Sequence, residues 1–179
     1  MSVGRLTRNH KRPHLLIEAF ARLAGRFPDW QAELWGGVDQ RAFYEELKFM
    51  IKSKNLQDRV FLKGTSSEIP KILQRSDIFA FPSAYEGFGL ALGEAMSMGL
   101  PAVGYKSCSA VNELIRDGVN GFLCEEGSEN LAAGLERLMG DRELRVRMGQ
   151  AARESMKQYA PEAIWDAWEN LLEEIAVKE

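Results

Sequence analysis

Short apolar segments alternate with longer segments of helical periodicity along most of this 179-residue chain. In the first long segment, for example, Leu16, Ala19, Phe20 and Leu23 recur at the spacing of one helix face. The segments typical of strands are 2–6, 31–35, 59–62, 78–81, 102–105 and 121–124. Since strand and helix alternate six times, the pattern predicts an α/β fold, an open parallel sheet of about six strands with helices on both faces.

From residue 129 to the end the pattern is helical, with breaks at Gly140 and Pro161. We therefore expect a helical C-terminal tail and place its last helix at 160–179, after a domain spanning 1–159. Six apolar residues give this last helix a wide apolar surface: Ala163, Trp165, Ala167, Trp168, Leu171 and Leu172. We expect both tryptophans to pack onto the domain's own sheet. The alternative is that this surface stays exposed for a second domain.

Composition excludes several classes of protein. With 23 basic and 26 acidic residues the net charge is −3, which argues against non-specific binding to nucleic acid. No apolar run approaches the roughly 20 residues that span a bilayer, and we expect no signal peptide. Two cysteines and two histidines are too few for a disulfide framework and make a zinc site improbable. We expect a cytoplasmic protein that meets membranes only peripherally, if at all.

Ligands of open parallel sheets bind at the carboxyl ends of the strands, so the loops after strands are the informative segments. The first such loop, residues 4–12, opens the first helix and carries Arg5, Arg8, Lys11 and Arg12. Basic side chains beside a helix N-terminus suit a phosphate group. A solvated basic turn explains this loop equally well.

The second loop, residues 83–90, leads into a helix that contains Glu94. Gly87 and Gly89 allow the backbone to approach a ligand closely. Glu86 is placed to accept hydrogen bonds from sugar hydroxyls, and Glu94 lies one turn inside the helix, within reach of a ribose. Two carboxylates beside a phosphate-binding turn favour a nucleotide-sugar site over a glycine-rich turn with two exposed glutamates.

The third loop, residues 106–113, offers small hydroxyl side chains and backbone N–H groups to a sugar or diphosphate. Helix capping by Ser109 is an equally good interpretation. Cys108 is expected to be exposed in this loop.

Residues 87–93 also match a loose dinucleotide fingerprint, G-x-G-x-x-x-G. That fingerprint belongs after the first strand of a sheet, whereas here it follows a later one. An oxidoreductase that binds a nicotinamide cofactor is therefore the weaker interpretation.

A set of motifs in a fixed order resembles the C-terminal, donor-binding half of GT-B glycosyltransferases, specifically the retaining family 4 within glycosyl transferases group 1. Glu86 and Glu94 form that family's E-x7-E signature, within the stretch 86–96. The other matching segments are 3–6 with Lys11, 16–20, 60–64, 77–83, 99–101, 113–115 and 117–121. The resemblance covers almost the whole chain and implies a Rossmann-like donor domain over 1–159.

The resemblance assigns roles to the matched positions. Arg5 and Lys11 would bind the donor diphosphate and stabilise the leaving nucleotide, and Glu86 would contact the donor sugar near its reacting centre. These three are the implied catalytic residues. The implied donor-binding residues are Gly4, Thr65, Phe88, Gly89, Leu90 and Glu94.

The family further implies a nucleotide-diphospho-sugar donor carried on uridine or guanosine, a glycan or lipid-linked acceptor, and no bound metal or other cofactor. The motifs are similar to those of bacterial transferases of polysaccharide biosynthesis. The chain starts at the first strand of the donor domain, so we expect the N-terminal acceptor domain to be absent and the isolated domain to be inactive in transfer. An alternative is a non-catalytic nucleotide-sugar-binding module or a subunit of a split transferase. A GT-B-like epimerase or phosphorylase remains open at the level of the fold.

Overall fold

The computed structural model describes residues 1–176 and contains two three-stranded parallel sheets, ordered β1-β2-β3 and β4-β5-β6. The strands are β1 (Ser2–Val3), β2 (Ala32–Trp35), β3 (Val60–Gly64), β4 (Phe79–Phe81), β5 (Ala102–Tyr105) and β6 (Gly121–Cys124). The two sheets meet at β1 and β4, where the Met1 carbonyl oxygen accepts a hydrogen bond from the N–H of Ala80 at 2.8 Å. The strands therefore lie in the order β3-β2-β1-β4-β5-β6. From β1 the next strands of the sequence are added on one side, and from β4 they are added on the other side, so the strand order reverses between β1 and β4. This confirms the predicted α/β fold.

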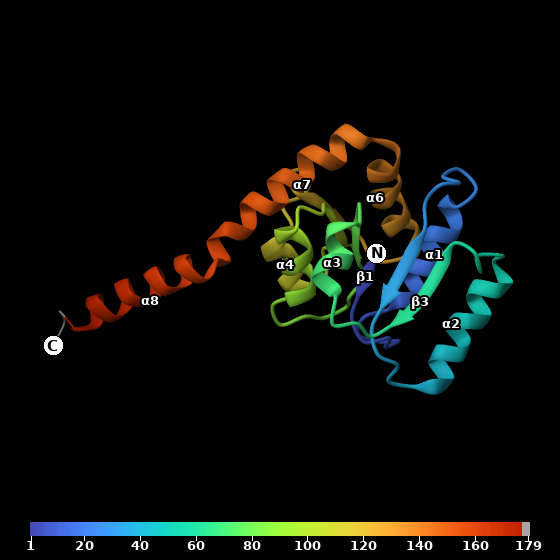
Figure 1. Cartoon of the computed structure of the whole chain (residues 1–179), viewed down its shortest axis with the longest axis horizontal. Coiled ribbons are helices and arrows are strands. Elements are labelled where there is room, and N and C mark those ends of the chain that lie inside the picture. Colours follow the sequence, from blue (N-terminus) through green and yellow to red (C-terminus); the bar gives the residue numbers. More distant parts are fainter. Residues whose placement is uncertain (177–179) are drawn as a thin grey trace.

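Helices cover both faces of the strands (Figure 1). They are α1 (Pro13–Leu23), α2 (Arg41–Ser53), α3 (Ile69–Gln74), α4 (Leu90–Ser97), α5 (Ser109–Leu114), α6 (Ser128–Gly140), α7 (Arg142–Met156), the 3-10 turn η1 (Lys157–Tyr159) and α8 (Pro161–Ala176). Successive strand residues point to opposite faces. Ala80 accordingly joins the core with α1, α2 and α6, whereas Phe79 and Phe81 join a second core with α4 and α5.

The first strand is shorter than predicted. We expected residues 2–6, but β1 ends at Val3, and Leu6 pairs with Val38 only as an isolated bridge. Beyond Val3 the N–H of Leu6 still donates to the carbonyl oxygen of Gly37 at 2.9 Å, and the two backbones approach closely: a Cβ atom added to Gly36 would lie 1.9 Å from the carbonyl oxygen of Gly4. Both glycines have positive φ, 154° at Gly4 and 151° at Gly36, which only glycine adopts readily.

The predicted last helix is present as α8, with residues 177–179 outside the described part of the chain, but the expectation that it packs onto the sheet was wrong. No side chain of α8 is buried, and Trp165 and Trp168 are 68% and 55% exposed instead of packing on the sheet. The chain passes from α7 through η1 into α8, which runs away from the body of the molecule (Figure 1). No helix among residues 1–176 has the length and apolarity needed to cross a membrane.

Candidate functional site

The loops that follow β1 and β4 lie side by side at the carboxyl edge of the strands. The N–H of Ala84 donates to the carbonyl oxygen of His10 at 2.8 Å. The rings of His10 and Tyr85 lie 5.7 Å apart, centroid to centroid. The fold thus brings together two of the three loops that the sequence singled out, at the point where strand order reverses.

Lys11 and Glu86 form an ion pair across these two loops. The Lys11 ammonium donates to Oε1 of Glu86, and their side chains are 26% and 12% exposed. The ammonium also lies 5.3 Å from the centre of the Phe81 ring. The Lys11 methylene groups pack against Gly4, where an added Cβ would come within 3.1 Å of Cδ. Three predicted site residues, Gly4, Lys11 and Glu86, are therefore in one place.

Arg5 differs from the other basic residues of its loop. Arg8 pairs with Glu46, and Lys11 and Arg12 also have acidic partners. Within residues 1–176 the guanidinium of Arg5 forms no ion pair, and it is exposed. Arg5 also lines a hollow of about 310 Å³, whose lining includes Asp39. Arg5 is thus the cation of this loop that is free to meet an anionic ligand.

The second loop ends at the start of α4. Gly89 is the N-cap, with a φ of 83° in the left-handed region that favours glycine. The N–H groups of Leu90 and Ala91 in the first turn have no intrahelical acceptor, as at any helix start, and they carry the positive end of the helix dipole. Leu90 is 72% exposed, whereas the Phe88 ring packs edge-on against Tyr159 at 5.2 Å. This helix start therefore has open access to solvent.

The remaining predicted residues lie farther out. Glu94 is exposed, one turn into α4. Thr65 is exposed just after β3, at the same edge of the sheet but two strands from β1. Its methyl group lies near Gly37, 3.6 Å from the position of an added Cβ. The structure does not bring Thr65 into contact with the Lys11–Glu86 pair.

The expectation for the third loop was wrong in two respects. Cys108 is buried, with 1% of its surface exposed, because its side chain joins the core cluster that contains Phe81 and Val111. Burial raises the pKa of this thiol, and the nearby carboxylate of Glu86 adds to the rise. Ser109 does not cap α5, since the helix has Cys108 at its N-cap and no side-chain cap hydrogen bond.

Sequence reasoning missed the organising role of Arg12. Its side chain is 13% exposed, and its guanidinium donates from Nε to the carbonyl oxygen of Pro82 at 3.0 Å and pairs with Glu126 at 3.0 Å. It also lies 5.0 Å from the centre of the Tyr105 ring. Glu126 accepts a second hydrogen bond from Ser107 at 2.6 Å, and these two donors, Ser107 first, lower the pKa of its carboxyl group. In the sequence, Arg12 is one of four basic residues, and nothing there distinguishes it.

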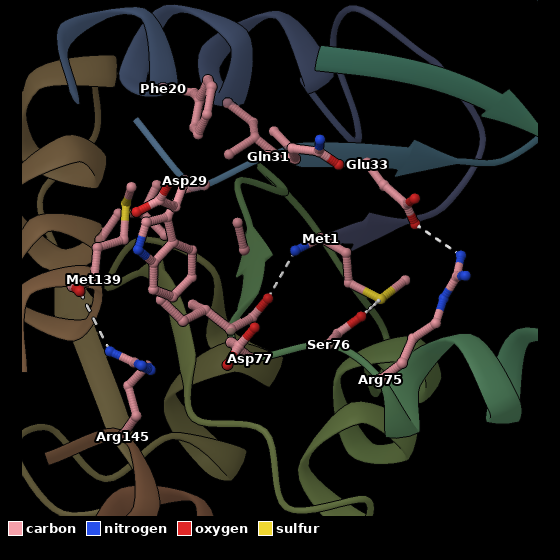
Figure 2. A pocket seen from close by; sticks show the side chains of 16 residues that line it. Met1, Phe20, Asp29, Gln31, Glu33, Arg75, Ser76, Asp77, Met139 and Arg145 are labelled. Atoms are coloured by element: carbon pink, nitrogen blue, oxygen red, sulfur yellow. Dashed lines mark hydrogen bonds and ion pairs between the residues drawn. The ribbon is translucent and has the colours of Figure 1, made fainter. Parts of the chain in front are cut away.

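A larger hollow lies elsewhere, at the amino ends of the strands (Figure 2). It measures about 530 Å³, and its lining includes Trp30, Glu33, Asp77 and Arg145. There the Met1 amino group donates to the carbonyl oxygen of Ile78 at 2.7 Å. Strand polarity favours the opposite edge as the ligand site, whatever the size of this hollow. Residues 1–176 contain no group of three His, Cys, Asp or Glu side chains arranged to hold a metal ion.

Three features define a Rossmann-like α/β domain: the strand order, its reversal between β1 and β4, and the basic and glycine-rich loops at that reversal. The family model described as glycosyl transferases group 1 matches residues 1–155, and the chain belongs to this family. A glycosyltransferase of Haemophilus influenzae described as uncharacterized is 31% identical over 173 residues, which are 96% of this chain and 48% of that protein. The N-acetyl-alpha-D-glucosaminyl L-malate synthase of Bacillus anthracis is 32% identical, over 92% of this chain and 42% of that protein. The chain thus spans about half the length of these relatives.

Solved structures agree on the fold. A complex of a Staphylococcus aureus TarM mutant with Fondaparinux, alpha-GlcNAc-glycerol and UDP has a TM-score of 0.85 and 29% identity, covering 95% of this chain and 34% of that one. Anabaena HepE in complex with UDP and glucose has a TM-score of 0.79 and 31% identity, covering 88% and 43%. The C-terminal domain of the Francisella tularensis group 1 protein LpcC has a TM-score of 0.78 and 29% identity, covering 88% and 83%. The fold is that of the C-terminal Rossmann-like domains of GT-B transferases.

Proposed function

We propose that this chain is the donor-binding half of a retaining GT-B glycosyltransferase of family 4. The donor is a nucleotide-diphospho-sugar carried on uridine or guanosine. The observation that carries the proposal is the Lys11–Glu86 ion pair at the reversal of strand order, with Arg5 lining the same small hollow as Lys11, and with Glu86 three residues before the N-cap of α4. The presence of UDP in the TarM and HepE complexes supports it.

In this proposal the chain supplies positioning and charge, and little covalent chemistry. The unpaired Arg5 guanidinium and the Lys11 ammonium neutralise the diphosphate as it leaves. The N–H groups at the start of α4, at Phe88, Gly89 and Leu90, hold sugar and phosphate oxygens, as helix starts do for anions.

The remaining predicted residues orient the rest of the donor. Glu86 contacts the donor sugar near the carbon that reacts. Glu94 binds the ribose, and Thr65, at the carboxyl end of β3, lies on the side of the base. Holding the donor in one orientation lowers the barrier by removing motion that the reacting groups would otherwise lose.

The acceptor is a glycan or lipid-linked saccharide, delivered by a second domain across a cleft. This chain alone then binds donor and transfers little. We also propose that donor binding needs no metal ion, so excess chelator should leave the affinity unchanged.

The experiment is calorimetric titration of the chain with UDP, GDP, ADP and NAD. The test variant is the double mutant Arg5→Ala/Glu94→Ala. The matched control is Arg26→Ala/Glu136→Ala, which removes the same charges from an exposed ion pair between the end of α1 and α6. We expect one nucleoside diphosphate to bind, the test variant to lose that binding, and the control to keep it. A preference for NAD, or equal binding by the test variant, would contradict the proposal.

A further inference from the structure

Arg12 has a backbone conformation that arginine rarely adopts. As the N-cap of α1 it has φ 45° and ψ 49°, in the left-handed region. Among the non-glycine residues of 1–176, only Asn55 also has a positive φ. Residues held in such conformations persist where the surrounding structure fixes them, and they cluster at functional sites.

Contacts of the Arg12 guanidinium hold the backbone of Arg12 in this conformation. It contacts the Pro82 carbonyl, the Tyr105 ring and the Glu126 carboxylate. One nitrogen, Nη2, is buried without a hydrogen-bond partner among the described residues. The side chain is thus mostly buried, 13% exposed, and is held there despite the cost of a buried unpaired donor.

The contacts of Arg12 join the ends of four strands. Pro82 follows β4, Tyr105 ends β5, and Glu126 follows β6, while Arg12 itself follows β1. Ser107, in the loop after β5, is joined through Glu126. Arg12 also immediately follows Lys11, and Pro82 lies four residues before Glu86. The spacing between the Lys11 loop and the Glu86 loop is therefore fixed by the Arg12 side chain together with the Ala84 to His10 hydrogen bond and the Lys11–Glu86 ion pair.

We propose that Arg12 is a positioning residue for the nucleoside-diphosphate site. Its guanidinium clamps the loops after β1, β4 and β6 so that Lys11 points into the site. It contacts no ligand itself: Nη1 pairs with Glu126, and Nη2 is covered by protein. This inference rests on the proposed function for the identity of the ligand.

The test compares Arg12→Gly with Arg12→Ala in the full chain, both with and without Lys11→Ala. Glycine accepts the positive φ without strain, so Arg12→Gly removes the clamp while relieving the backbone. The control is Arg22→Ala, on the same helix, whose ion pair with Glu129 is exposed. We measure the affinity for UDP and GDP by calorimetry.

We expect Arg12→Gly and Arg12→Ala each to weaken nucleoside-diphosphate binding about tenfold. In the Lys11→Ala background each should change the affinity less than about twofold, since the effects of substitutions at residues that act through one another are not additive. A loss of general stability would carry over into both backgrounds. Equal losses in the two backgrounds, or wild-type affinity in Arg12→Gly, would overturn the proposal.

A second readout does not depend on the ligand. Hydrogen exchange at the Ala84 N–H reports the bond between the two loops, and we expect Arg12→Gly to speed it about tenfold relative to Arg22→Ala, because local opening controls such exchange. Unchanged exchange would overturn the clamp. If the wild type binds no nucleoside diphosphate, the proposed function fails, and the exchange result still decides whether the clamp exists.

Discussion

Replacing Glu86 by glutamine separates the two predicted partners of the candidate site. In the chain without ligand, the Lys11 ammonium is bound to the Glu86 carboxylate, with the side chains 26% and 12% exposed. An incoming diphosphate has to compete with that carboxylate for the ammonium. Glutamine keeps the shape of the side chain but removes its charge, so Glu86→Gln releases Lys11 without opening a cavity.

The size of the effect follows from the burial of the pair. A hydrogen bond between charged groups contributes about 1.5–3 kcal/mol when buried. Solvent reaches a quarter of the Lys11 side chain, so we take the lower end. Since about 1.4 kcal/mol corresponds to a tenfold change in affinity, Glu86→Gln should bind UDP or GDP roughly tenfold more tightly than wild type.

The assay is calorimetry with the free nucleoside diphosphate and with its sugar conjugate. The conjugate should gain less than the free nucleotide, because the proposed contact between Glu86 and the donor sugar is weakened. Glu129→Gln, on the exposed partner of Arg22, is the control and should change neither affinity. Weaker nucleotide binding by Glu86→Gln, equal to that of Lys11→Ala, would refute the reasoning by showing that the ion pair builds the site instead of competing for it.

Three further predictions test the fold and its side-chain environments. Gly36→Ala should lower the free energy of unfolding in urea by about 3 kcal/mol, because the new Cβ would meet a backbone oxygen at 1.9 Å; Gly25→Ala, with open space around it, should change it little, and similar values for both would contradict the packing. Removing residues 161–179 should change the same free energy by less than about 0.5 kcal/mol, since no side chain of α8 is buried; a larger loss would show that α8 packs on the domain. Burial raises the pKa of Cys124 from 9.0 to about 12, so the stability from its neutral thiol is complete below pH 9 and is lost as pH rises toward 12. The free energy of unfolding in urea should therefore decline across that pH range, and Cys124→Ala should reduce the decline. The same dependence on pH in both proteins would contradict this prediction.

Much of the fold could be predicted from hydrophobic periodicity. The strands at 102–105 and 121–124 have the predicted bounds, because buried apolar runs between turn residues mark them clearly. The first strand was predicted too long because the bounds of β1 depend on its pairing with β2, a contact between segments far apart in sequence. The exposure of α8 was the alternative and not the preferred interpretation, because the sequence of an apolar helix face does not show which surface packs against it.

The candidate site could be predicted only in outline. The rule that ligands bind at strand ends brought the Lys11 and Glu86 loops together correctly. Their ion pair depends on side-chain conformation, and the burial of Cys108 depends on how α5 packs; neither is visible in a one-dimensional pattern. The positive φ of Arg12 was equally hidden, since sequence rules assign that conformation to glycine or asparagine.

The most direct test of the central claim is to find which residues a nucleoside diphosphate approaches when it binds. Amide chemical shifts of the labelled chain, followed by NMR during titration with UDP and with GDP, report every backbone N–H that the ligand approaches. The account predicts that the largest shifts fall at Arg5, Lys11, Leu90 and Ala91, around the start of α4. Shifts confined to the opposite edge of the sheet, around the hollow of about 530 Å³ near Trp30, would contradict it.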